Sequence, residues 1–178
     1  MTTRIALALP LTFALAAFAL RAAADKPQQK NGPKNEGLER FKLLAGDWVG
    51  TMNHDGAETD GEVHYKVTSA GSAVVETIMP GTDHEMVTVI HQDGKDLALT
   101  HYCALGNQPH MKTSGKQKAN QFAFEFTGAS NMDSENDMHM HSVVYTFVDK
   151  DTLKADWSHY VDGKEAGKAV IELKRKKA

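Results

Sequence analysis

Apolar and polar residues alternate with a period of two through most of the chain after Gly46. Residues 122–126 are a clear case, because phenylalanine occupies every second position. Successive side chains of a β-strand point to opposite faces, so this period predicts strands with one buried face. About ten such short segments follow one another, separated by Gly, Asp and Asn. The pattern predicts an all-β protein, built as a sandwich or as an up-and-down antiparallel barrel.

One helical candidate precedes the strands, over Leu38–Leu44, where Leu38, Phe41 and Leu44 are spaced three residues apart. The helix is short and therefore has to dock on the strands to be stable. Residues 38–175 are enough for one domain with a sizeable core. Residues 176–178 form a short basic tail.

The first 24 residues have the features of a signal peptide. Arg4 supplies the positive charge, Ile5–Leu20 is an apolar run, and Ala22–Ala24 matches a small-residue cleavage site. We expect cleavage after Ala24 and export to the periplasm or the medium, with no stable membrane insertion afterwards. The alternative is an uncleaved membrane anchor. Residues 25–37 are polar apart from two prolines and are predicted to be a disordered linker.

Composition excludes several classes of protein. The formal net charge is -3, which argues against nucleic acid as a partner. Cys103 is the one cysteine, so an exported chain of this kind has no internal disulfide. The sequence contains no dinucleotide-binding glycine pattern, Walker loop, HExxH, zinc-ribbon spacing or GxSxG.

Residues 81–111 contain the clearest hairpin, with Asp93-Gly94 at its turn. A two-residue turn at Asp93-Gly94 pairs Met86 with His101, whereas a three-residue loop that includes Gln92 pairs Glu85 with His101. The second arrangement also aligns Val87 and Val89 with two leucines. It therefore predicts that Glu85 and His101 face each other on the inner side.

A second Asp-Gly turn near the end of the chain, at Asp162-Gly163, guides this choice. A three-residue loop there places Trp157 opposite Gly167 and aligns two apolar faces, whereas a two-residue turn places Trp157 opposite Lys168. The apolar alignment favours the three-residue loop, and we expect the same loop in both hairpins.

Several motifs resemble a group of exported bacterial calycin-like (lipocalin-like) proteins of uncharacterised function. They are LAGDWVG, HEMVTV, LTHYC, GNQPHM and the late HMH and DGK, and the match covers most of residues 38–173. The resemblance implies a single antiparallel up-and-down calycin-like barrel of about ten strands with a short N-terminal helix. It also implies a basic residue after the last strand that packs near Trp48, a place that Arg175, Lys174 or Lys176 fits. Nitrobindin-like haem barrels share the architecture, but their haem-ligand motif does not map onto this sequence.

The strand pattern gives the inner face an unusually polar set of residues. Histidine, cysteine and glutamate side chains supply polar groups, and Tyr65, Phe124 and the two tryptophans supply an apolar wall. His159 shares the inward parity of Trp157. The predicted ligand-binding residues are Trp48, Tyr65, Glu85, His101, Cys103, His139, His141, Tyr145 and Trp157.

Three hypotheses for function follow. The first is a non-enzymatic binder of a small, partly polar ligand, because small barrels can hold one such ligand in the interior. The second is a metal- or haem-binding barrel that uses the inward His, Cys and Glu residues, since imidazole with thiolate or carboxylate suits zinc or copper. The third is a hydrolase or isomerase that uses Glu85 and His101. A barrel filled by its own side chains is the structural alternative. The sequence leaves the cofactor, ligand identity and oligomeric state open.

Overall fold

The computed structural model describes residues 35–113 and 117–177. The signal peptide expected at residues 1–24 lies outside this range, as does most of the predicted linker. No helix in the described range is long and apolar enough to cross a membrane. The elements, in chain order, are α1 (Glu36–Lys42), β1 (Gly46–His54), β2 (Ala57–Thr68), η1 (Ser69–Gly71), β3 (Ala73–Ile78), β4 (Met86–Asp93), β5 (Asp96–Tyr102), β6 (Gln108–Thr113), β7 (Gln121–Ser130), β8 (His139–Phe147), β9 (Thr152–Val161) and β10 (Lys164–Arg175).

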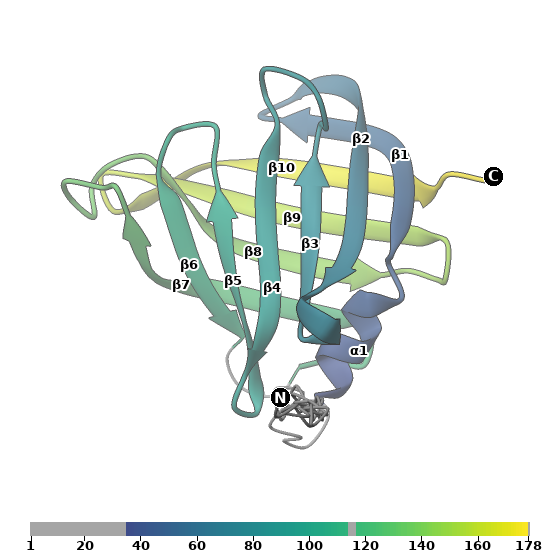
Figure 1. Cartoon of the computed structure of the whole chain (residues 1–178). Helices are drawn as coiled ribbons and strands as arrows, with labels where there is room; N and C mark the ends of the chain where they lie inside the picture. Colours follow the sequence, from purple (N-terminus) through teal and green to yellow (C-terminus); the bar gives the residue numbers. More distant parts are fainter. Residues whose placement is uncertain (1–34, 114–116, 178) are drawn as a thin grey trace, which may run out of the picture. The chain divides into compact units, whose positions relative to one another are not determined.

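The ten strands form a closed antiparallel barrel in which each strand pairs with its neighbours in the sequence (Figure 1). β1 pairs with β10 and closes the sheet, from Trp48 opposite Arg175 to His54 opposite Ala169. The prediction of an up-and-down barrel of about ten strands is therefore confirmed. Closure leaves no unpaired edge strand in the sheet.

The barrel has two different ends, because successive strands run in opposite directions. We call the end that carries α1 the helix end, and the end with the β1–β2, β3–β4, β5–β6, β7–β8 and β9–β10 connections the far end (Figure 1). At the helix end the ring of Phe41 packs edge-on against Tyr145 and Phe147, with centroids 5.2 and 5.3 Å away. Phe41 is fully buried. The helix thus seals this end of the core.

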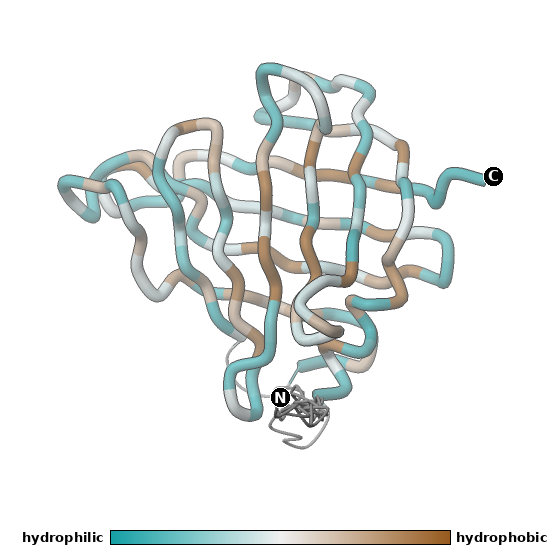
Figure 2. The backbone as a smooth tube through the Cα atoms, viewed as in Figure 1, coloured by the Kyte–Doolittle hydropathy of each residue, from teal (hydrophilic) through white to brown (hydrophobic). Residues whose placement is uncertain are grey.

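The helix begins two residues earlier than the apolar spacing predicts. Asn35 caps it, since its Oδ1 accepts hydrogen bonds from Gly37 N at 2.9 Å and Leu38 N at 3.3 Å. Residues 35–37 were expected in the linker, because an N-cap is polar and carries no apolar periodicity. Along the strands, apolar and polar segments alternate as predicted (Figure 2).

The register predicted for the first hairpin is wrong. The turn consists of Gly94 and Lys95, with Asp93 opposite Asp96, and Thr88 rather than Glu85 lies opposite His101. Gly94 has φ of 62°, which two-residue turns with glycine first require. The shift by an odd number of residues exchanges the two faces of β4. Glu85 therefore lies in the exposed β3–β4 connection, where its Oε2 accepts a hydrogen bond from Gly81 N at 2.6 Å.

The last hairpin also differs from the prediction, but its inward face is preserved. Its turn is the two-residue Asp162-Gly163, with Val161 opposite Lys164. A β-bulge between Glu165 and Gly167 then shifts the register by one residue. Trp157 consequently lies opposite Ala169, not opposite the predicted Gly167.

Arg175 occupies the place that the calycin resemblance implies for a basic residue. Its guanidinium carbon lies 4.3 Å from the centre of the Trp48 ring. The same group donates hydrogen bonds to Ala45 O at 2.9 Å and Leu43 O at 2.7 Å. Arg175 thus ties the last strand to the segment that connects α1 with β1.

Replacing Arg175 with alanine is expected to lower the free energy of unfolding by about 2 kcal/mol. The change removes a cation–π contact and charged hydrogen bonds to two backbone carbonyls. Lys174→Ala is the matched control, because Lys174 is the exposed neighbour on the same strand. Urea unfolding of both variants measures the effect, and equal losses for the two would contradict this role of Arg175.

Candidate functional site

A ladder of polar residues crosses four neighbouring strands on the inner face of the barrel. Tyr65 on β2 lies opposite Glu76 on β3, Glu76 lies opposite Thr88 on β4, and Thr88 lies opposite His101 on β5. In antiparallel pairs, residues directly opposite each other share a face. With Tyr145 and Trp157 from the other side of the barrel, this ladder forms a group that we call the polar centre.

Hydrogen bonds connect the members of the polar centre. Tyr65 donates its hydroxyl proton to Glu76 Oε1 at 2.5 Å, and Tyr145 donates to Glu76 Oε2 at 2.9 Å. Thr88 Oγ1 lies 2.9 Å from His101 Nδ1. All these residues are buried, and at most 2% of the surface of each residue is exposed. Both carboxyl oxygens of Glu76 are therefore satisfied inside the barrel.

Burial controls the ionisation of the polar centre. Burial raises the pKa of Glu76, while hydrogen bonds from Tyr65, Thr88 and Tyr145 lower it in part. Burial, followed by the nearby Glu76 charge, raises the pKa of Tyr65 and Tyr145 well above the usual 10.0. Burial lowers the pKa of His101 from 6.5 to about 4. His101 is thus neutral at neutral pH and offers both a donor and an acceptor.

The two tryptophans of the barrel differ in their hydrogen bonding. Trp48 Nε1 donates to Leu44 O at 2.7 Å. Trp157 Nε1 is buried and finds no acceptor among the described residues. The Trp157 ring lies against His101, with centroids 4.7 Å apart. A buried donor without a partner carries a free-energy penalty, so this position favours an added acceptor.

Four methionines lie between the polar centre and the far end. Met52 lies near the end of β1 and Met140 near the start of β8, both at the far end of the barrel. Met86 is the first residue of β4, and Met79 follows β3. All four are partly buried and pack against the core. Methionine side chains are flexible and adapt to apolar groups of different shapes. They add flexible apolar side chains to the core at this end of the barrel.

His139 and His141 form a separate cluster toward the far end. His139 Nε2 lies 3.0 Å from His141 Nδ1, and the Phe126 ring packs against both imidazoles at 4.5 and 5.0 Å between centroids. Tyr160 stacks on His141 at 3.7 Å. Burial, and then the neighbouring His139, lowers the pKa of His141.

The predicted site residues are thus divided among several places. The polar centre contains Tyr65, His101, Tyr145 and Trp157, and Trp48 packs edge-on against Tyr65 at 6.2 Å. Cys103 is half-buried just beyond β5, and burial raises the pKa of its thiol. Of the predicted set, His139 and His141 lie in their own cluster, and Glu85 is in solvent. His159, which shares the inward parity of Trp157, stacks on His54 at the far end.

Two members of the polar centre, Glu76 and Thr88, are not among the residues predicted from the sequence. Glu76 lies in β3, and Val74 and Ile78 on either side of it are buried. The alternation Val-x-Glu-x-Ile places a carboxylate on an apolar face, and this was the available signal.

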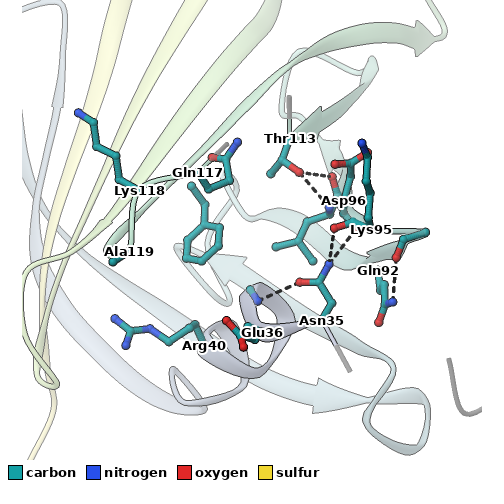
Figure 3. A pocket seen from close by; sticks show the side chains of 14 residues that line it. Asn35, Glu36, Arg40, Gln92, Lys95, Asp96, Thr113, Gln117, Lys118 and Ala119 are labelled. Carbon is teal, nitrogen blue, oxygen red and sulfur yellow. Dashed lines mark hydrogen bonds between the residues drawn. The ribbon is translucent and has the colours of Figure 1, made fainter. Parts of the chain in front are cut away.

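A cleft of about 860 Å³ lies at the helix end, between the start of α1, the β4–β5 turn and the β6–β7 connection (Figure 3). Asn35 lies on its wall and joins two of these segments, because its Nδ2 donates to Lys95 O at 2.9 Å while its Oδ1 caps the helix. The polar groups of Asn35 in this cleft thus hold the helix to the barrel.

Comparisons with known proteins agree with the fold. No family model matches the chain, and no curated protein sequence matches it. Thirteen chains of solved structures match. One is the crystal structure of Rv2717c from M. tuberculosis, with a TM-score of 0.57 and 12% sequence identity, covering 79% of this chain and 97% of that one. At this identity the similarity establishes the architecture alone. The chain is therefore a closed ten-strand antiparallel barrel, similar in architecture to that protein.

Proposed function

We propose that this protein is an exported, non-enzymatic binding barrel that takes one small, partly polar ligand in the far half of its interior. The polar centre forms the floor of this site, and Met52, Met79, Met86 and Met140 supply the apolar walls. The observation that carries the proposal is the buried indole N–H of Trp157, which has no acceptor in the described part of the chain.

The chemistry of the floor indicates what the ligand offers. Trp157 Nε1 is a donor only, so the ligand supplies an acceptor such as a carbonyl or ether oxygen. His101 uses Nδ1 with Thr88, so its Nε2 is the nitrogen that faces a ligand. The low pKa of His101, about 4, keeps the imidazole neutral, which favours an uncharged polar group over an anion. An apolar portion of the ligand would pack on the methionines.

Catalysis has less support. The hydrolase or isomerase hypothesis relied on a Glu85–His101 pair, and these residues do not lie opposite each other. The carboxylate that does lie in the interior, Glu76, is hydrogen-bonded by two tyrosines through both of its oxygens. A general base has to lie within hydrogen-bond reach of the proton that it abstracts, whereas the Glu76 carboxyl group is directed toward these two tyrosines.

Trp157→Phe is expected to abolish ligand retention and to leave the barrel folded. Phenylalanine keeps an aromatic ring against His101 but removes the N–H donor. Native mass spectrometry of protein purified from the envelope fraction of its host measures retention. The same spectra test export, because the mass of the polypeptide shows whether the chain begins at Asp25. Trp48→Phe is the matched control, because Trp48 already donates to Leu44 O. Retention of the same ligand by Trp157→Phe would contradict the proposed site.

A further inference from the structure

The turn between β1 and β2 brings two histidines and one aspartate together at the far end of the barrel. His54 is the last residue of β1, and Asp55 follows it with φ of 49° in the turn. His159 comes from β9, on the opposite side of β10 from β1. One ligand atom from each residue lies within 4.8 Å of the others, and this is the one such group of three in residues 35–113 and 117–177.

Backbone hydrogen bonds to β10 fix the orientation of the Asp55 carboxylate. Asp55 N donates to Lys168 O at 3.0 Å, and Lys168 N donates to Asp55 Oδ1 at 2.8 Å. The other oxygen, Oδ2, lies 3.8 Å from His54 Nδ1 and 3.8 Å from His159 Nε2. One carboxylate oxygen is thus held by the backbone and the other faces two imidazoles. This is the outer-shell arrangement that orients metal-binding carboxylates in proteins.

Gly167 makes the close approach of Asp55 and His159 possible. It lies opposite His159, at the β-bulge of β10. A Cβ at this position would lie 2.2 Å from Asp55 Oδ1 and 2.5 Å from His159 Cε1. Any other residue here would push the two groups apart. The bulge and the missing side chain together create the space in which the three side chains meet.

The hydrogen bonding of His159 is incomplete. The residue is 4% exposed, and its buried Nδ1 has no hydrogen-bond partner within the described range. Its Nε2 faces Asp55 at 3.8 Å, which is too long for a direct hydrogen bond. Nε2, the nitrogen next to Asp55, is the one available to an ion. The 3.8 Å spacing is instead close to that of two ligands sharing one tetrahedral ion, which is roughly 3.4 Å for bonds of about 2.1 Å.

We propose that His54, Asp55 and His159 bind one divalent transition-metal cation, with zinc(II) as the preferred probe. Two imidazole nitrogens and one carboxylate oxygen match the ligand types of zinc sites that keep a fourth position open. Mg²⁺ and Ca²⁺ prefer six or more oxygen ligands and do not suit this set. The site is separate from the polar centre and does not depend on the ligand proposed above.

Isothermal titration of tag-free, chelator-treated protein with zinc chloride tests the proposal. The expected result is one equivalent of zinc bound by the wild-type protein, at least tenfold weaker binding for His54→Ala and for Asp55→Asn, and no comparable binding of Mg²⁺. Asparagine preserves the acceptor for Lys168 N and tolerates the left-handed turn. His54 is exposed, so its replacement leaves the core intact.

Two variants control for incidental binding by surface histidines. His64→Ala removes an exposed imidazole that lies 2.6 Å from Asp47, and His141→Ala removes one member of the other histidine cluster. Both are expected to bind zinc within twofold of the wild type. Electron paramagnetic resonance with one equivalent of copper(II) is expected to show two nitrogen ligands in the wild type and one in His54→Ala. Absence of stoichiometric zinc binding, or equal weakening in the control variants, would overturn the assignment.

Discussion

Replacing Glu76 with alanine is expected to lower the free energy of unfolding by about 4 kcal/mol. The substitution leaves the hydroxyls of Tyr65 and Tyr145 buried without the acceptors that now lie at 2.5 and 2.9 Å. Each buried donor without a partner costs about 1–3 kcal/mol, and the cavity adds to the loss. Urea unfolding at neutral pH measures the change.

Glu76→Gln separates the hydrogen bonds from the volume of the side chain. Glutamine fills the same space, and its amide oxygen still accepts from one tyrosine, so we expect a loss of about 1–2 kcal/mol. The cost of burying a charge, which raises the pKa of Glu76, is also absent from this variant. A loss below about 1 kcal/mol for Glu76→Ala would mean that the polar centre does not organise the interior.

His101 is expected to make the barrel less stable in acid, by about 3 kcal/mol between neutral pH and pH 4. Burial lowers the pKa of this imidazole from 6.5 to about 4 in the folded protein. Between these values the unfolded chain binds the proton and the folded chain does not, so the free energy of unfolding falls as pH falls. The free energy of unfolding falls by roughly 1.4 kcal/mol for each pH unit between the unfolded pKa of 6.5 and the folded pKa of about 4.

The variant His101→Gln isolates this contribution. Glutamine offers a partner to Thr88 but does not titrate. The raised pKa of Glu76 acts in the opposite direction, because it favours the folded state as pH falls, and it is common to both proteins. The difference between the two stability curves therefore reports His101. Parallel curves from pH 7 to pH 4 would show that the imidazole is not desolvated as the structure indicates.

The all-β class was predictable from sequence because the alternation is repeated along the chain, and the resemblance to calycin-like proteins favoured a barrel over a sandwich. Ten alternating segments each place one face inward, and an error in one segment leaves the others unchanged. The contact of Arg175 with Trp48 followed from the resemblance to calycin-like proteins and is present at 4.3 Å. Five of the predicted site residues, Trp48, Tyr65, His101, Tyr145 and Trp157, are buried in the core.

The details that decide the sites depend on single residues in turns and bulges. Because the first turn is at Gly94-Lys95, Thr88 lies opposite His101 in place of the predicted Glu85. The Asp-Gly-Lys pattern occurs in both hairpins but is used in different registers, so one could not serve as a guide to the other. Periodicity gives the face of a residue within a strand, but the turn sets which residue lies opposite it.

The grouping of His54, Asp55 and His159 was also beyond sequence reasoning. His159 is about a hundred residues from the adjacent His54 and Asp55, and the three meet through the closure of β1 onto β10 and the bulge at Gly167. A sequence pattern carries no signal for such a meeting. In the same way, the hydrogen bonding of Glu76 depends on Tyr145, which comes from the opposite wall of the barrel.

The central claim, that a ligand binds above the polar centre through Trp157, is most directly tested by the two indole N–H signals in a ¹H–¹⁵N correlation spectrum. Trp48 and Trp157 are the two tryptophans of the chain. Protein titrated with a small-molecule extract of the host envelope is expected to show a shift of the Trp157 indole signal, because that N–H gains an acceptor. The Trp48 signal is expected to stay in place, because its N–H already donates to Leu44 O at 2.7 Å. A bound ligand that leaves the Trp157 signal unchanged, or that shifts both signals equally, would contradict the account.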